Sequence, residues 1–400
     1  MPKSARLALT LAALLPFAQI GAQSTTLPAQ SATLGAPSAT LDAQAQPPAR
    51  SLDFSGLIFG NYQIRTDSAA KAANGGQSPN KFDLERVYFT FKMPVGDRFG
   101  IRATTDIFQN ANNNYYNGWN VRLKYGYLEY KFANDVAGFS ALSRIGILQT
   151  VVIDHEESFW PRYLANVAVE KYGWFSSADA GFATQLSLPA KMGEVYATVT
   201  NGPGYTAPEN DRFKDFAARL TLTPLASFYG FLSSLTISPW YYKGSIASAF
   251  ATDRVNPITS PLDRNRWGVL AGLNDPHLVA AVHYSRRIDG FESGANTAGS
   301  PVVVTDSTGA VLSAHAIIKP LQWTSGHDKS TLGAVVRWDS YKPRVGVNGA
   351  EQFVIAGLQW ELSARTAITA DYQALTPQAF AGPAPVTRTN TWFVHWVASF

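Results

Sequence analysis

The chain has 400 residues, no cysteine and a formal net charge of +4, with 16% charged and 12% aromatic residues. The lack of cysteine excludes a disulfide framework and thiolate chemistry, and few charges with many aromatic residues are untypical of a disordered chain. A mean hydropathy of −0.08 argues against a protein built from membrane-spanning helices. Neither a cofactor nor a nucleic-acid partner is expected.

The chain begins with a segment typical of export. Residues 1–22 contain a basic start, an apolar stretch (7–18) and small residues at the end, which predicts a cleaved secretory signal peptide too short to span a bilayer. A buried N-terminal helix is the alternative. Residues 23–50 are mostly Ala, Gln, Ser, Thr and Pro and predict a flexible low-complexity leader. The remaining residues, 51–400, form one predicted domain.

From residue 51 onward, segments of about ten residues alternate between apolar and polar positions, which is the period of a β-strand. None of them shows sustained helical periodicity. The sixteen predicted strands are 53–65, 81–93, 98–108, 119–131, 140–149, 178–188, 193–200, 213–223, 233–243, 265–274, 277–288, 312–320, 328–339, 351–362, 365–375 and 390–400. The predicted fold is therefore all-β.

The connections between these strands are sorted by length. The odd ones are long (66–80, 109–118, 150–177, 201–212, 244–264, 289–311, 340–350 and 376–389), whereas most even ones are short turns. Three even connections, 133–139, 224–232 and 321–327, are of intermediate length. Short turns at one rim and long loops at the other are typical of a transmembrane antiparallel up-and-down β-barrel of an outer membrane.

The two faces of the strands support this interpretation. In 119–131 the predicted lipid face carries Trp119, Val121, Leu123, Tyr125 and Tyr127, and the predicted lumen face carries Asn120, Arg122, Lys124 and Gly126. Because lipid offers no hydrogen-bond partners, such strands must close into a ring. About sixteen strands enclose a lumen too wide for side chains of the wall alone to fill.

The last predicted strand, 390–400, ends on an aromatic residue. Trp392, Trp396 and Phe400 share one parity, which predicts that they face lipid or the interfacial aromatic girdle. Closure of the barrel requires this strand to pair with 53–65.

Several stretches resemble a known family. They are FDLERVYFTFKMPVGDRFGIRATTDIF (82–108), YNGWNVRLKYGYLEYKF (116–132), NGPGYTAPENDRFKDFAARLTLTPL (201–225) and the closing strand. These are similar to the phosphate-selective porin O and P family, over about residues 50 to 400. The resemblance implies a trimeric sixteen-stranded barrel, a constricting third loop, and a final aromatic residue recognised by the barrel-assembly machinery. Few lysines lie on the predicted lumen face, so the resemblance supports this architecture more strongly than it supports a phosphate substrate.

Strand parity also predicts which charges line the lumen. The predicted basic lining consists of Arg86, Arg102, Arg122, Lys124, Arg144, Arg219 and Arg337, and the acidic lining of Asp106, Asp179, Glu194, Asp215 and Asp371. A modest basic excess predicts a mild anion preference, because charges in a narrow aqueous pore raise the local concentration of counter-ions. The alternative is that these arginines pair with neighbouring carboxylates and only support the wall.

The longest loop, 150–177, is the third at its rim. Its aromatic residues argue against disorder, and we expect it to fold into the lumen and constrict the pore. The expected constriction residues are Asp154, Glu156, Glu157, Trp160 and Arg162, with the carboxylates facing the wall arginines. An ordered lid at the rim is the alternative. One histidine among three acids fits no metal pattern, so no metal site is expected.

Together these features predict a porin of a Gram-negative-type outer membrane. It would let small hydrophilic solutes diffuse passively, with a mild preference for anions, and phosphate is one candidate anion. Its expected partners are outer-membrane lipid, those solutes or anions, the barrel-assembly machinery and two further copies of the chain. The alternatives are a non-conducting structural or adhesive barrel and an outer-membrane enzyme, although no nucleophile and histidine set stands out.

Overall fold

The structure is a computed structural model that describes residues 51–400 apart from 111–117, 229, 255, 325–330 and 379–386. The predicted signal peptide and leader, 1–22 and 23–50, lie outside the described residues.

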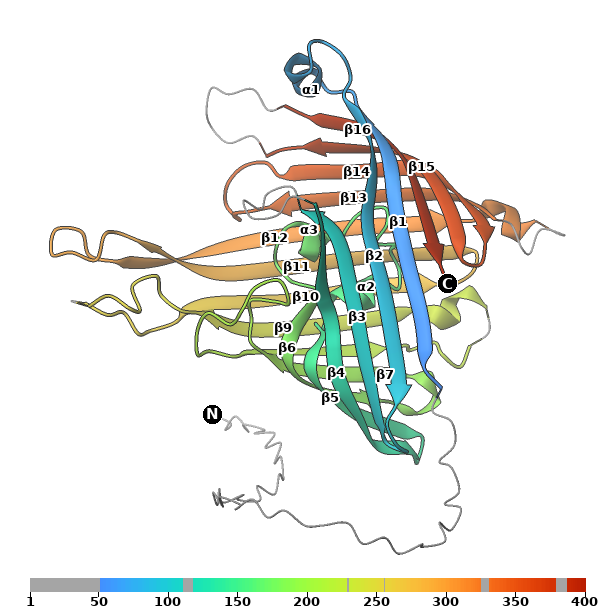
Figure 1. The fold of residues 1–400 in the computed structure, drawn as a ribbon, viewed down its shortest axis with the longest axis horizontal. Helices are drawn as coiled ribbons and strands as arrows, with labels where there is room; N and C mark the ends of the chain where they lie inside the picture. The colour runs from blue at the N-terminus through green and yellow to red at the C-terminus, as the bar shows by residue number, and fades with distance from the viewer. Residues whose placement is uncertain (1–50, 111–117, 229, 255, 325–330, 379–386) are drawn as a thin grey trace, which may run out of the picture. The chain divides into compact units, whose positions relative to one another are not determined.

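Sixteen antiparallel strands form one closed barrel in which each strand pairs with its neighbours in the chain (Figure 1). The fold class and the strand number are as predicted. The strands are β1 (Asp53–Arg65), β2 (Asn80–Pro94), β3 (Phe99–Asn110), β4 (Gly118–Val136), β5 (Phe139–Gln149), β6 (Ala178–Ser187), β7 (Gly193–Thr200), β8 (Asp215–Leu222), β9 (Thr236–Ile246), β10 (Leu262–Asn274), β11 (Leu278–Ser293), β12 (Val303–Ile318), β13 (Leu332–Lys342), β14 (Glu351–Ser363), β15 (Thr366–Thr376) and β16 (Thr389–Ser399).

The barrel closes between its first and last strands. β1 pairs with β16 from Leu57↔Ser399 to Arg65↔Thr391, as predicted. Beyond this ladder, the Phe400 backbone N–H donates to the Gly56 carbonyl (3.1 Å), and the Gly56 N–H donates to the Phe400 carbonyl (2.9 Å). The last residue of the chain is therefore part of the closing seam.

Alternation along the strands separates an apolar outer wall from a polar inner one. Large exposed side chains such as Val121, Phe216 and Trp360 cover the outside, whereas buried polar groups such as Asp106 and Arg337 face inward. No helix in the described part of the chain is long and apolar enough to cross a membrane.

One part of the face prediction is wrong. The β3–β4 register shifts between Thr104 and Thr105, which pair with Tyr125 and Leu123, so Lys124 is the extra residue of a β-bulge. The bulge reverses the alternation after Leu123. Tyr125 and Tyr127 are consequently buried inside the barrel rather than exposed to lipid.

Two connections also differ from prediction. Most of the predicted loop 289–311 is strand, because β11 and β12 continue as a paired ribbon to Ser293↔Val303, and this ribbon projects beyond its neighbours in Figure 1. The predicted connection 133–139 is a tight turn, because β4 continues to Val136, which pairs with Phe139.

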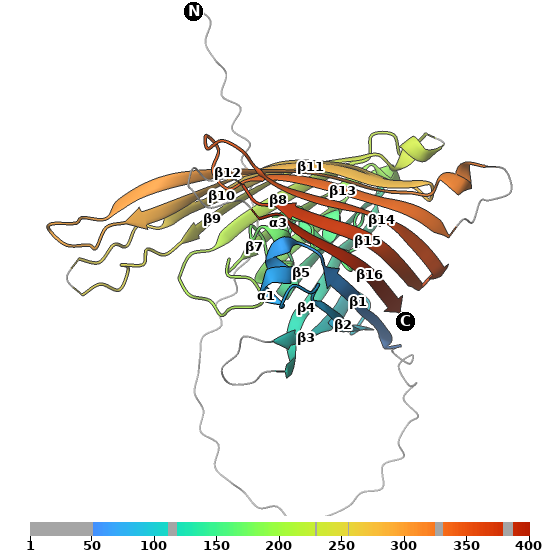
Figure 2. The same ribbon diagram turned by 90° about the horizontal axis from the view of Figure 1, so that it is seen from above.

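The helices are short and lie in the connections. They are α1 (Ser68–Ala73), α2 (Ile153–Glu156), α3 (Ala168–Lys171), η1 (Pro189–Lys191), η2 (Phe231–Ser234) and η3 (Pro320–Trp323). Asp67 caps α1, since its carboxylate accepts from the Ala70 N–H at 2.9 Å. Figure 1 shows α1 beyond the ends of β1 and β16, and in Figure 2 the same helix is drawn in front of the strands. α2 and α3 belong to the third loop, which determines the shape of the lumen.

Candidate functional site

The third loop, 150–177, lies inside the barrel and has an apolar core of its own. Its apolar residues are almost fully buried, including Val151, Ile153, Trp160, Val169 and Trp174. They form one hydrophobic cluster with inward-facing wall residues such as Val335 and Ile355. The loop therefore occupies lumen space, and the alternative of a lid at the rim does not describe its position.

Polar contacts fix the loop to the strands of the second half of the chain. The Tyr163 hydroxyl lies 2.9 Å from Thr369 Oγ1 and accepts from Gln359 Nε2 at 2.7 Å. Arg337 on β13 donates to the Asn166 carbonyl at 2.8 Å. These contacts hold the loop against β13, β14 and β15.

A buried polar network fixes the start of the loop to β9 and β11. Glu156 Oε2 lies 2.8 Å from His283 Nδ1, and the Trp240 indole N–H donates to His283 Nε2 at 3.0 Å. Because the indole nitrogen can only donate, Nε2 is the acceptor and the imidazole proton is on Nδ1, facing the carboxylate. This interaction lowers the pKa of Glu156 in spite of the opposing effect of burial.

The same network has the connectivity of a hydrolytic triad, which sequence reasoning did not find. Ser285 Oγ lies 2.8 Å from His283 Nε2, on the opposite side of the ring from Glu156. The exposed fractions of Ser285, His283 and Glu156 are 0%, 1% and 0%. A nucleophile buried in this way cannot meet a substrate, so we assign the network a structural role and call it the loop latch (Glu156, Trp240, His283 and Ser285).

The three predicted constriction carboxylates do not pair with the predicted wall arginines. Besides Glu156 in the latch, Asp154 accepts from the Tyr125 hydroxyl at 2.7 Å. Glu157 forms an ion pair with Arg162, which also contacts Glu170 at 2.7 Å. Burial raises the pKa of Glu157 to about 7, although the Arg162 charge opposes this shift.

Trp160 lies deeper, between loop and wall. Its indole N–H donates to the Ala165 carbonyl at 2.9 Å, and its ring faces the Arg337 guanidinium at 5.2 Å and His315 at 5.1 Å. Trp160 thus supports the loop from behind.

Most of the predicted lining arginines pair with carboxylates of the wall. Their partners lie on the same strand or on the adjacent one. The pairs are Arg86–Asp106 (3.6 Å), Arg122–Asp106 (2.7 Å), Arg144–Glu129 (2.9 Å), Arg219–Glu194 and Arg337–Asp339 (2.8 Å). Asp215 lies 3.9 Å from Arg264, and Asp371 lies 3.2 Å from His395. These pairs neutralise much of the basic lining.

Two predicted lining residues differ from the rest. Lys124 is buried under the rings of Tyr88 and Tyr125, with its Nζ 4.7 Å and 5.3 Å from their centroids. Arg102 lies over Tyr125 at 4.4 Å and donates from Nε to Thr104 at 3.2 Å. Within the described residues neither forms an ion pair.

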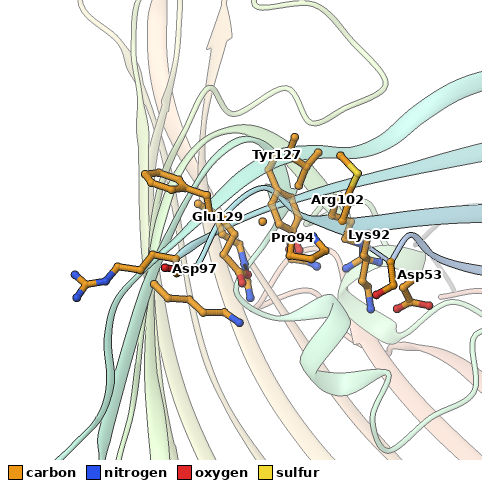
Figure 3. Close-up of a pocket in the computed structure, with 17 residues that line it drawn as sticks. Asp53, Lys92, Pro94, Asp97, Arg102, Tyr127 and Glu129 are labelled. Carbon is orange, nitrogen blue, oxygen red and sulfur yellow. Dashed lines mark hydrogen bonds and ion pairs between the residues drawn. The ribbon is translucent and has the colours of Figure 1, made fainter. Parts of the chain in front are cut away.

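A cavity lies beside Arg102, between β2–β5 and the short-turn rim. It has a volume of about 540 Å³, and Figure 3 shows its lining, with Lys92 beside Asp53 at one end and Glu129 beside Asp97 at the other. Five basic residues and three acidic ones line it: Lys92, Arg98, Arg102, Lys131 and Arg144, and Asp53, Asp97 and Glu129. The cavity is therefore moderately basic.

A smaller cavity lies farther toward the long-loop rim on the same side of the barrel. Its volume is about 290 Å³, and β1, β2, β3 and the third loop contribute its lining, which includes Asp83, Glu85, Arg86 and Arg162. Along β2 the two cavities use residues 83–86 and 92–94, and Tyr88 lies between these segments. Tyr88 is buried there, with Lys124 Nζ 4.7 Å from its ring centroid.

Two further predictions concern metal binding and the C-terminal assembly signal. No group of three His, Asp or Glu side chains in the described ranges could hold a metal ion. Trp392, Trp396 and Phe400, the predicted assembly signal, all expose their rings on the outer face.

Comparison with known proteins gives the architecture alone. No protein-family model and no curated protein sequence matches the chain. Among solved structures, the chain is similar to the outer membrane channel DcaP of Acinetobacter baumannii (13% identity, TM-score 0.59, 88% of this chain and 97% of DcaP). It is also similar to OmpF of Salmonella typhi (12%, 0.57, 88% and 98%) and to OmpT, an outer membrane protein of Vibrio cholerae (12%, 0.54, 89% and 99%). At these identities the likeness shows the barrel fold, and membership of the phosphate-selective family stays a prediction.

Proposed function

We propose that the chain is an outer-membrane porin through which small hydrophilic solutes diffuse passively. The observation that carries the proposal is a closed barrel with an apolar outer wall and charged cavities on one side of its lumen. A closed ring leaves no strand edge unpaired in lipid, where unpaired backbone groups are costly.

The position of the third loop supports a restricted path. Hydrogen bonds hold the loop to β11 and to β13, β14 and β15, and the two cavities lie along β1 to β5, where Arg162 of the loop also lines the smaller one. Solutes would pass between the loop and this wall, with Tyr88, Lys124 and Tyr125 at the narrow part. In this proposal Asp154, Glu157 and Arg162 border the path, whereas Glu156 and Trp160 hold the loop in place.

The mild anion preference rests on the larger cavity. Its five basic and three acidic residues favour anions at the short-turn end of the path. Nothing in the site favours phosphate over other anions.

The remaining parts of the proposal concern location and assembly. The proposal includes export by the signal peptide 1–22 and an outer-membrane location, which the sequence pattern supports. It also includes recognition of Trp392, Trp396 and Phe400 by the assembly machinery, which the family resemblance supports. A homotrimer is supported by analogy, since one of the similar OmpT structures is described as a trimer form.

Single-channel recording of the refolded protein in a planar bilayer under a KCl gradient tests the proposal. We expect stable open steps with a reversal potential that favours chloride, and a larger conductance after deletion of 154–170. Inserted protein that never conducts would contradict the proposal and favour the non-conducting barrel, which the buried core of the third loop also fits.

A further inference from the structure

Lys124 and Arg102 are the two predicted lining cations without a carboxylate partner in the described part of the chain. The other five, from Arg86 to Arg337, each contact an Asp or Glu. The two exceptions lie on neighbouring strands, β4 and β3, and both lie over the ring of Tyr125. Neither cation is held in an ion pair with a described residue, and Arg102 lines the 540 Å³ cavity, so its charge can attract an anion from the lumen.

Lys124 has unusual surroundings for a lysine. Its exposed fraction is 4%, and it makes neither a hydrogen bond nor an ion pair with any residue that the structure describes. The β-bulge creates this position, because it turns two successive residues, Lys124 and Tyr125, toward the interior. An ammonium group removed from water is costly unless a counter-ion or polar partner compensates it. The tyrosine rings compensate it in part.

Arg102 supplies the directional part of the site. Its Nε is occupied by Thr104 Oγ1 at 3.2 Å, and that hydroxyl lies 2.9 Å from Thr90 Oγ1. The two terminal nitrogens of the guanidinium are left without a described partner. They form a planar fork that matches the two oxygens of a carboxylate. Arg102 also lines the 540 Å³ cavity, so a solute can reach it.

We propose that Lys124 and Arg102 form a binding site for a small monocarboxylate at the narrow part of the path. This proposal rests on the proposed porin function and names the class of solute that the path selects. Arg102 binds both carboxylate oxygens through its terminal nitrogens, and Lys124 adds a second positive charge nearby.

The surroundings favour a monoanion over phosphate. Asp154 lies against the Tyr125 hydroxyl at 2.7 Å, so a negative charge is already close to the site. Repulsion from Asp154 grows with the negative charge of the solute, so a dianion is repelled more than a monoanion. A tetrahedral phosphate would also leave oxygens unpaired, because the site offers one fork and one ammonium group.

Binding can be measured without ion flow. In ¹⁹F NMR of trifluoroacetate with the refolded protein in detergent, we expect line broadening that acetate reverses at lower concentration than inorganic phosphate does. Lys124→Gln and Arg102→Lys should each weaken the binding about tenfold or more, the latter because a lysine keeps the charge and loses the fork. Lys214→Gln is the matched control, since Lys214 is exposed and lies in another loop, paired with Glu209.

The outcomes separate this site from the porin function. Broadening that is equal in Lys124→Gln, Arg102→Lys and the Lys214→Gln control overturns the site, and so does stronger displacement by phosphate than by acetate. A protein that conducts KCl in bilayers but does not broaden the signal is a porin without the site. A protein that broadens the signal but does not conduct retains the site and loses the porin function. Arg102→Lys is the variant less apt to disturb folding, and circular dichroism of both variants checks that the barrel is intact.

Discussion

Replacing Glu156 with alanine should loosen the third loop, because Glu156 is the carboxylate of the loop latch. The substitution removes a hydrogen bond between a buried carboxylate and His283, made at 2.8 Å, and leaves the Nδ1–H of His283 without its acceptor. A hydrogen bond to a charged group contributes about 1.5–3 kcal/mol. Glu156 Oε1 has no described partner, so the cost of burying that oxygen offsets part of the stabilisation from the hydrogen bond to His283. We therefore expect about 2 kcal/mol, which is roughly a thirtyfold change in an equilibrium constant.

The assay is single-channel recording of the time spent in states of raised conductance. Loop displacement widens the path, so Glu156→Ala should visit such states about thirtyfold more often than the wild type. Glu209→Ala is the control, because Glu209 is an exposed loop carboxylate paired with Lys214, and such surface pairs contribute about 0–1 kcal/mol. Equal open-state occupancy in the two variants would refute the latch. The Tyr163 and Asn166 contacts remain in the variant, so the loop should return to its closed position.

The other predictions concern charge, packing and closure. Burial raises the pKa of Glu157 to about 7, so its carboxylate gains a negative charge between pH 6 and pH 8. The preference for chloride, measured as the reversal potential, should therefore fall over this pH range. In Glu157→Gln the preference should stay constant. Gly272→Val should displace the third loop and raise conductance, because a Cβ at this position would lie 2.6 Å from the ring of Phe159. Ala271→Val, on the outer face, should leave the conductance unchanged. Identical conductance in the two variants would argue against this packing. Gly56→Val should lower the yield of folded barrel in refolding gels, since its side chain would clash with the terminal phenylalanine ring at the seam.

Strand positions could be predicted well because each wall strand has two different environments. Lipid on one side and water or polar groups on the other impose the period of two, and this period is visible in composition alone. The seam was predictable for a related reason: an apolar final strand needs a partner, and in a closed ring β1 provides it.

The β-bulge at Lys124 was not predictable from the pattern. Tyr125 and Tyr127 are apolar enough to continue the outward series that begins at Trp119, so the alternation gives no sign of a reversal. The inward position is explained only by tertiary contacts, such as the Tyr125 hydroxyl with Asp154 and Arg144 over the Tyr127 ring at 5.4 Å. A one-residue insertion of this kind changes the face of every later residue.

The site itself was predictable only in part. Parity placed the lining arginines, but their partners depend on strand register, as for Arg144 on β5 and Glu129 on β4. The loop latch joins Glu156 and His283, which are 127 residues apart, and no local pattern connects them. The available signal was the length of loop 150–177 with its aromatic residues and carboxylates, and it suggested a constriction rather than an anchor.

The interior position of the third loop has a consequence for biogenesis. Tyr163 contacts Thr369, which follows it by 206 residues, so the loop cannot reach its final position until nearly the whole chain is available. Until then its tryptophans and valines are exposed to water, and chains of such high contact order fold slowly and tend to aggregate. A protein truncated before β15 should therefore depend on chaperones to stay soluble, and the last two strands complete the interior as well as the wall.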